Sequence, residues 1–338
     1  MGLSVRRLAL VALLLVGLAG CRIDVILHQH DPLPEGVEWD ASDIEMLPNG
    51  EFVAGGCLFT LGGPGLGVVV FAPDATVVRV LSRCSSIEDG ALGVAAAADG
   101  TIYFVRSREI IPFEEYRYEL VRIPPGGSAS DGVVVHSDTA SDRFSVPTPF
   151  FSPAVSPDGS IVLVRSADPD KPGIFMVTGP TTRHRRPGTE GLDASNGYEV
   201  RNDGTIITLD GNTVVSITRR GAKTVLAGTG QAGFSGDGGP ATQATFNEPS
   251  DVAQGPAGVI HVADFGNDRI RRIAPDGTIR TVAGGGTEDP DAGGLALNAQ
   301  LDGPWRIAYD GTQPGVGDEL WLLEEPFVDG DLLYLGVR

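Results

Sequence analysis

The feature that most constrains the fold is a motif that recurs along the chain: a tight turn ending in glycine, followed at once by a β-rich strand. Glycine suits such turns because it adopts positive φ without steric strain. The turns recur at intervals of about 45 to 60 residues, at Asn49-Gly50, Asp99-Gly100, Asp158-Gly159, Asp203-Gly204 and Ala257-Gly258. A sixth copy is less regular, with one strand at residues 305–309 and the next at 319–323. Such self-similarity indicates a chain built from repeats of one supersecondary unit.

The repeat unit is clearest in residues 250–284, where four short apolar or alternating runs are separated by turn residues. This pattern is typical of a four-stranded antiparallel meander. No amphipathic helix of three turns follows the first 20 residues. Six meanders of this period predict an all-β fold, a six-bladed β-propeller of four-stranded antiparallel blades over residues 36–338.

Two copies carry a resemblance to known repeat families. Phe246-Asn-Glu-Pro-Ser-Asp-Val-Ala, followed by Gly258-Val-Ile-His-Val-Ala-Asp-Phe-Gly-Asn-Asp-Arg-Ile, resembles an NHL repeat. Residues 151–164, with Ser-Pro-Asp-Gly at the turn, are similar to the repeats of TolB-like propellers. The other copies diverge from both patterns. Both resemblances imply the propeller architecture that the repeat spacing predicts.

The last copy contains three strands before the chain ends, one fewer than a blade needs. Residues 23–27, Ile-Asp-Val-Ile-Leu, are apolar and β-prone and have no other evident partner. We therefore expect this segment to add the missing outer strand, which would close the ring and cover an exposed sheet edge.

The N-terminus has the features of an export signal. Arg6 and Arg7 precede a short apolar run, which predicts a signal peptide over residues 1–20. Leu18-Ala-Gly-Cys21 resembles a bacterial lipobox, which implies cleavage before Cys21, acylation of that cysteine by palmitate or a similar chain, and a lipid tether over residues 21–35. Arg22 stands where inner-membrane retention would use Asp, which favours the outer membrane of the cell envelope. An ordinary signal peptide is the alternative.

The charge of the chain restricts its partners. The net charge is −19, and removal of Arg6 and Arg7 with the signal takes it to about −21. Nucleic acids and anionic lipid surfaces attract basic patches, which this chain lacks. We therefore expect no nucleic-acid partner, membrane contact through the lipid alone, and a monomer.

Two cysteines remain after Cys21. Cys57 and Cys84 would be exported and could form a disulfide. Free thiols are the alternative, and no Cys-x-x-Cys spacing suggests zinc or redox chemistry.

The glycine-rich residues 226–246 raise the question of a phosphate or calcium loop. No Gly-Lys-Ser/Thr and no following helix is present, which excludes a P-loop and a dinucleotide fingerprint. Residues 283–304 align with this stretch, so both are interpreted as copies of one blade-to-blade connector. Ca²⁺ bound through Ser235 and Asp237 is the alternative, and it is the one cofactor considered.

The first strand of each propeller blade lines the central channel. Counting back seven residues from each turn glycine, and using the proline alignment for the last copy, brings Asp251, Arg306 and Asp43 to consecutive blades. These three residues are the candidate cluster at the channel mouth, either recognising a ligand or stabilising ring closure.

Two functions from different classes remain. The first is a non-catalytic, surface-tethered binding scaffold for a protein, peptide or glycan, and it is preferred because no catalytic motif is present. The second is an envelope lyase or lactonase-like hydrolase that uses a divalent cation. Its candidate ligands are Asp43, Glu45, Glu199 and Asp251.

Overall fold

The computed structural model describes residues 25–29, 37–60, 63–72, 77–84, 91–111, 115–140, 151–166, 172–192, 197–288, 295–310, 318–323 and 332–337. These residues form β-strands joined by turns and by short 3-10 helices. No helix among them has both the length and the apolar character needed to cross a bilayer.

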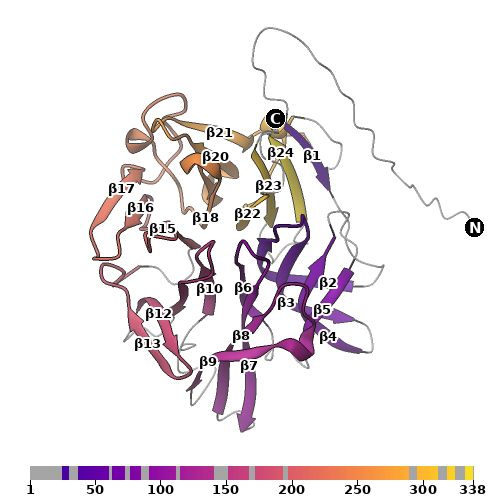
Figure 1. Ribbon diagram of the computed structural model, residues 1–338. Helices are drawn as coiled ribbons and strands as arrows, with labels where there is room; N and C mark the ends of the chain where they lie inside the picture. Colours follow the sequence, from indigo (N-terminus) through magenta and orange to yellow (C-terminus); the bar gives the residue numbers. More distant parts are fainter. Residues whose placement is uncertain are drawn as a thin grey trace, which may run out of the picture.

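The described strands form six four-stranded antiparallel sheets, which we call blades and which surround a central axis (Figure 1). Blade 1 contains β2 (Val37–Met46), β3 (Phe52–Thr60), β4 (Gly63–Phe71) and β5 (Val77–Cys84). Blade 2 contains β6 (Ala91–Ala96), β7 (Ile102–Ile111), β8 (Glu115–Ile123) and β9 (Val133–Ala140). Blade 3 contains β10 (Phe151–Val155), β11 (Val162–Ser166), β12 (Gly173–Gly179) and β13 (Thr182–Arg185).

The second half of the chain repeats this order. Blade 4 contains β14 (Tyr198–Val200), β15 (Ile206–Leu209), β16 (Val214–Ile217) and β17 (Lys223–Ala227). Blade 5 contains β18 (Asp251–Gln254), β19 (Ile260–Asp264), β20 (Arg269–Ile273) and β21 (Ile279–Gly284). Blade 6 contains β22 (Arg306–Asp310), β23 (Asp318–Leu323) and β24 (Leu332–Val337), with β1 (Val25–Gln29) as its outer strand. The predicted all-β propeller of four-stranded antiparallel blades is confirmed.

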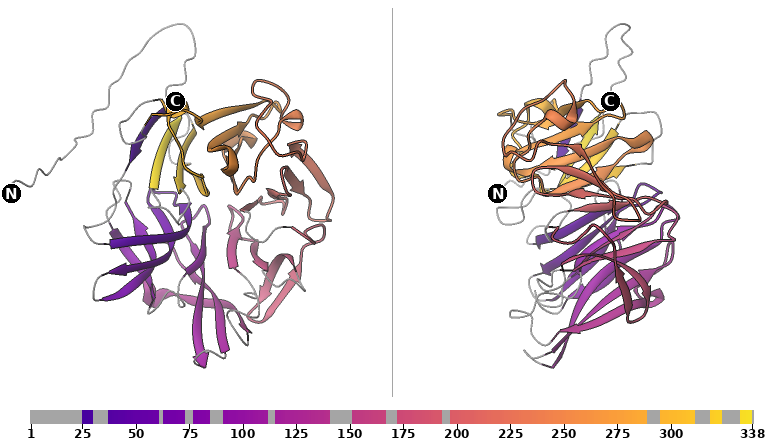
Figure 2. Two further views of the ribbon diagram at one scale, coloured as in Figure 1. Left: turned by 180° about the vertical axis from the view of Figure 1, so that it is seen from behind. Right: turned by 90° about the vertical axis from the view of Figure 1, so that its left-hand side faces the viewer.

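The ring is closed by strands from opposite ends of the chain. β1 pairs antiparallel with β24, from Val25 opposite Val337 to Gln29 opposite Leu333. Figure 2 shows β1 beside β24 from behind the molecule. The sequence had placed this strand at residues 23–27, two residues earlier than β1. The innermost strands also meet around the axis, because β2 contacts both β6 and β22. The first and last blades are therefore neighbours.

The turns after the inner strands explain why the repeat is so visible in the sequence. Asp99, Asp158 and Asp203 each accept a hydrogen bond from the backbone N–H two residues further on, at 2.8 to 3.0 Å. The glycine after each aspartate has a φ between 71° and 85°. A side chain that bonds its own turn and a residue that tolerates positive φ together fix a tight connection.

The hydrophobic core lies between neighbouring blades, so most blades are buried on both faces. In β15, Ile207 packs with Val252 and Val262 of blade 5, whereas Ile206 packs with Ala154 and Leu163 of blade 3. Successive side chains of a strand point to opposite faces of the sheet. A strand held between two blades is therefore buried at every position, as Ile-Ile-Thr-Leu of β15 illustrates, and its one polar side chain, Thr208, is hydrogen-bonded.

The glycine-rich residues 226–246 run from the end of blade 4 to blade 5. Backbone bonds fold this connector on itself, with Gly228 N–H donating to Ala241 O at 2.9 Å and Gly233 N–H to Phe246 O at 3.0 Å. Asp237, considered above as a calcium ligand, pairs instead with the Arg271 guanidinium at 2.7 Å. These contacts support the interpretation as a connector. The second copy, at residues 283–304, is described only in part.

Candidate functional site

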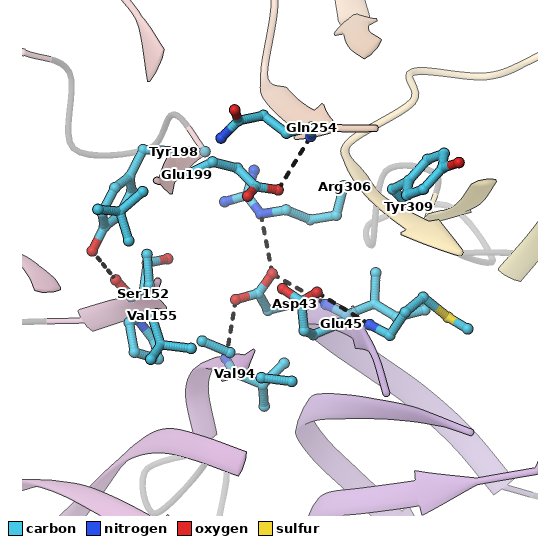
Figure 3. A pocket seen from close by; sticks show the side chains of 18 of the residues that line it. Asp43, Glu45, Val94, Ser152, Val155, Tyr198, Glu199, Gln254, Arg306 and Tyr309 are labelled. Atoms are coloured by element: carbon cyan, nitrogen blue, oxygen red, sulfur yellow. Dashed lines mark hydrogen bonds and ion pairs between the residues drawn. The ribbon is translucent and has the colours of Figure 1, made fainter. Parts of the chain in front are cut away.

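A cavity of about 390 Å³ lies on the axis of the propeller and is lined by residues from the innermost strands of all six blades. A cavity of this size is typical of sites for small molecules or for a side chain of a larger partner. Figure 3 shows the carboxylates of Asp43, Glu45 and Glu199 directed toward its middle, together with the guanidinium of Arg306. The cavity is therefore polar at its centre.

The three residues of the predicted cluster all line this cavity. The Arg306 Nε lies 3.9 Å from Asp43 Oδ1, which is a loose ion pair across the closure between blades 6 and 1. The same guanidinium donates to the backbone carbonyls of Ser250 at 3.4 Å and Trp305 at 3.2 Å. The geometry thus brings Asp43 and Arg306 together but leaves the arginine partly committed to the backbone.

The two aspartates of the cluster have the same local role, which is to join adjacent blades. Asp43 Oδ2 accepts the N–H of Val94 in blade 2 at 3.0 Å. Asp251 Oδ2 accepts the N–H of Ile307 in blade 6 at 2.9 Å. Their Oδ1 atoms accept the N–H of Ile44 at 3.1 Å and of Val252 at 2.8 Å. All four carboxylate oxygens are thereby engaged with the backbone.

The small residues at the corresponding positions of other blades leave room for these carboxylates. A Cβ added to Gly197 of blade 4 would overlap Oδ1 of Asp251. A Cβ added to Gly93 of blade 2 would lie 2.8 Å from the Cα of Ser152. Ser152 itself has a φ of 40°, next to a β-bulge between β10 and β11. Glycine at positions 93 and 197 is therefore required by close packing around the axis.

Glu45 and Glu199 are the other two acids of the cavity, and their contacts are weaker. Glu45 Oε1 accepts the N–H of the next residue, Met46, at 3.2 Å. Glu199 Oε1 accepts the N–H of Gln254 in blade 5 at 3.4 Å. Neither backbone bond is short, but Glu199 also has a side-chain hydrogen bond with Gln254, and the charge of Arg201 acts on it. These two carboxylates are therefore more available to a ligand than Asp43 and Asp251.

All four acids have raised pKa values, chiefly because burial disfavours the charged form. The pKa of Asp43 is raised to about 7 by burial, against the opposing effect of Arg306. Burial raises the pKa of Glu199 to about 8, with a further contribution from the charge of Asp251. The pKa of Glu45 lies well above its usual range because of burial and the nearby charge of Glu199. Burial also raises the pKa of Asp251. The cavity therefore holds protons near neutral pH.

One wall of the cavity was not anticipated from the sequence. The Tyr198 hydroxyl donates to the Ser152 carbonyl at 2.7 Å, and Arg165 lies over the Tyr198 ring at 4.8 Å. Arg165 also donates to Thr208 Oγ1 at 3.0 Å. Arg165 belongs to β11, a second strand, so counting positions along the inner strands could not have found it. Tyr198 follows the predicted ring position Gly197 and was detectable as its neighbour.

The remaining predicted residues lie elsewhere. Cys21, the signal segment and most of the tether are outside the described residues. Cys57 lies on β3 and Cys84 on β5, and β4 lies between these strands. Two strand spacings amount to about 9.5 Å, whereas disulfides typically join Cα atoms 4.4 to 6.8 Å apart. The disulfide stays a prediction, and this spacing argues against it.

The NHL-like positions of blade 5 serve its structure. Asp264 accepts the N–H of Asn247 at 2.9 Å and the side-chain amide of Asn267 at 2.9 Å. Arg269 donates to the carbonyl of Asn267 at 2.6 Å. His261 is fully buried and stacks against Tyr309. These contacts fit the turn and packing roles that the repeat predicts.

The described residues contain no group of three or more His, Cys, Asp or Glu side chains placed to hold a metal ion. For Asp43 and Asp251 the reason is visible, since backbone N–H groups occupy their oxygens. The four-carboxylate ligand set of the metal-dependent alternative is therefore not assembled in this part of the chain.

The fold and the cavity define the class as a β-propeller with an acidic axial cavity. No family model and no curated protein matches the sequence. The chain is similar to a solved protein of unknown function from Bacteroides thetaiotaomicron, with a TM-score of 0.67, 16% identity, and coverage of 94% of this chain and 77% of that chain.

Two further solved structures carry functional names. One is an auxiliary nutrient binding protein from Bacteroides ovatus, with a TM-score of 0.60, 12% identity, and coverage of 94% of this chain and 78% of that chain. The other is a virginiamycin B lyase from Staphylococcus aureus, with a TM-score of 0.51, 13% identity, and coverage of 93% and 100%. At these identities the likeness establishes the fold alone.

Proposed function

We propose that this protein is a non-catalytic binding protein of the bacterial cell envelope, whose ligand site is the axial cavity. The observation that carries the proposal is the cavity itself, enclosed by all six inner strands and lined by polar side chains at its centre. The ligand is a small molecule, or a residue of a protein, peptide or glycan that reaches into the channel. The name of the Bacteroides ovatus neighbour, a nutrient binding protein, is consistent with this role.

The binding role is preferred to the metal-dependent lyase or lactonase because of how the acids are bonded. Asp43 and Asp251 hold neighbouring blades together through backbone N–H groups. A carboxylate engaged in this way is a poor candidate for the open coordination position that metal-assisted hydrolysis needs.

Ligand binding can be tested by measuring the melting temperature of the full-length chain in detergent with a panel of short peptides and oligosaccharides. Ala98 lines the cavity and is exposed, so Ala98→Trp should narrow the channel without disturbing the core. We expect at least one compound to stabilise the parent chain by several degrees and to have no effect on Ala98→Trp. No stabilising compound, or stabilisation that Ala98→Trp leaves unchanged, would overturn the proposal.

The envelope location rests on the sequence, and we propose that Cys21 carries the lipid. Cells expressing the chain should incorporate labelled palmitate into it, and Cys21→Ser should abolish the label. Cys84→Ser is the matched control and should retain it. Equal labelling of Cys21→Ser and the parent chain would exclude Cys21 as the acylated residue.

A further inference from the structure

Acidic side chains outnumber basic ones in the lining of the cavity. Its described lining contains four carboxylates, Asp43, Glu45, Glu199 and Asp251, and one guanidinium, that of Arg306. That guanidinium lies 3.9 Å from Asp43 and also donates to the backbone carbonyls of Ser250 and Trp305. Arg201 acts on Glu199 and Arg165 acts on Asp251 from outside this lining, so the four acidic groups have three arginines near them.

The acidic groups that are most available to a ligand belong to two residues, Glu45 and Glu199. Asp43 and Asp251 are each bonded through both oxygens to backbone N–H groups. Glu45 and Glu199 each accept one long bond from the backbone, at 3.2 and 3.4 Å, and Glu199 also has a side-chain hydrogen bond with Gln254. Both glutamates point into the open part of the cavity in Figure 3.

The lining of the cavity also contains small apolar side chains. Ala95 and Ala154 stand two residues beyond the ring positions Gly93 and Ser152, as Glu45 stands two beyond Asp43. Val155 and Val200 line the same cavity. A ligand here meets a negative centre and an apolar wall.

Resting on the function proposed above, we propose that the cavity binds an organic cation, with an ammonium or guanidinium group seated between Glu45 and Glu199 and its hydrocarbon part against the alanine and valine wall. Such a group donates several hydrogen bonds, and its positive charge favours the ionised form of carboxyl groups that burial otherwise keeps protonated. A neutral sugar has no charge that would stabilise the ionised carboxylates, and an anion would oppose their ionisation.

The same cation could be a free amine or the side chain of a lysine in a peptide. Both sources present the same ammonium group to the cavity. They differ in whether the channel mouth also contacts the backbone of a bound peptide. Cadaverine serves as the probe for the first, and the peptide acetyl-Ala-Lys-Ala-amide for the second. Their neutral counterparts are 1,5-pentanediol and the same peptide with norleucine in place of lysine.

The experiment is calorimetric titration of the full-length chain at pH 8. We expect at least one cationic probe to bind and its neutral counterpart to bind at least tenfold more weakly. Glu45→Gln combined with Glu199→Gln should weaken the cation at least tenfold, and each single change should weaken it less. Glu190→Gln, an exposed glutamate outside the cavity, is the matched control and should have no effect.

Several outcomes separate the two proposals. A neutral probe that binds as tightly as the cation, or cation binding that survives the double glutamine change, would overturn the cation class. If only neutral compounds bind, and Ala98→Trp blocks them, the ligand is not an organic cation but the proposed binding function stands. If no probe and no panel compound binds in a way that Ala98→Trp weakens, both proposals are overturned. Circular dichroism of the double variant confirms that it is folded before its binding is judged.

Discussion

Two clusters in this molecule combine a buried arginine with aspartates, and they differ in how completely the charges are paired. In blade 5, the fully buried Arg271 lies 2.7 Å from Asp237 and 3.3 Å from Asp264. It also donates to Ser235 O at 3.0 Å and lies over the ring of Phe234 at 4.8 Å. In the channel, the Arg306 Nε lies 3.9 Å from Asp43 Oδ1.

The comparison teaches that a buried arginine beside aspartates does not by itself distinguish a structural cluster from a ligand site. Burial raises the pKa of Asp264 as it raises those of the channel acids, so a raised pKa does not separate them either. What differs is that two carboxylates share Arg271, whereas four line the cavity beside Arg306. A buried arginine with well-placed partners holds the connector to its blade, and a surplus of acid beside an open cavity favours a cationic ligand.

The largest loss of stability is expected when the structural cluster around Arg271 is disrupted. Arg271→Ala leaves Asp264 buried without its cation, and breaking a buried ion pair in this way costs about 3–5 kcal/mol of unfolding free energy. Chemical denaturation measures the loss. Arg220→Ala, on an exposed turn, is the control and should change stability little. A loss below about 1 kcal/mol for Arg271→Ala would contradict a structural role for the cluster.

A smaller effect is expected at the channel ring. Gly197→Ala places a methyl group where Oδ1 of Asp251 lies, and overpacking of this kind costs about 1–3 kcal/mol. Asp251→Ala removes the obstructing carboxylate, so the double variant should lose less than the sum of the two single changes. Gly239→Ala meets only a carbonyl at 3.3 Å and serves as the control. Strict additivity of the two changes would show that the ring is not packed in this way.

The smallest expected effect is the pH dependence of stability that arises from the cavity acids. The pKa values of Asp43 and Glu199 rise from 3.8 and 4.5 to about 7 and about 8. Folding therefore favours their protonated forms, so their contribution to stability is fully present below about pH 4 and is lost as the pH rises through 7 to 8. The charged groups acting on them are Glu45, Asp251, Arg201 and Arg306. The protein should melt at a higher temperature at pH 5.5 than at pH 8.5.

Glu199→Gln tests the origin of that pH dependence. It removes one titrating group and should raise the unfolding free energy at pH 8.5 by about 1 kcal/mol while changing it little at pH 5.5. The turn residues Asp99 and Asp203 have lowered pKa values, so their effect falls below this range. If the unfolding free energy of Glu199→Gln changes between the two pH values as much as that of the parent chain, the cavity acids do not cause the pH dependence.

Much of the fold follows from local chemistry that the sequence displays. The Asp-Gly turns fix where inner strands end, and the apolar run of β15 reflects burial between two blades. Counting back from the turn glycines located Asp43 and Asp251 on the cavity wall, and the proline alignment located Arg306, because strands of one register bring equivalent positions to the same height. The glycine-rich connector was recognised from its second copy.

The sequence by itself thus determined the blades, their order around the ring and the residues that reach the axis, since turn spacing and alternation are local properties. Only the tertiary structure decided which charges are paired. Asp237 and Arg271 are brought together by the path of a connector, and Tyr198 meets Arg165 from a different blade. Pairing depends on distances between side chains far apart in the chain, and Coulomb and hydrogen-bond energies fall away within a few ångström.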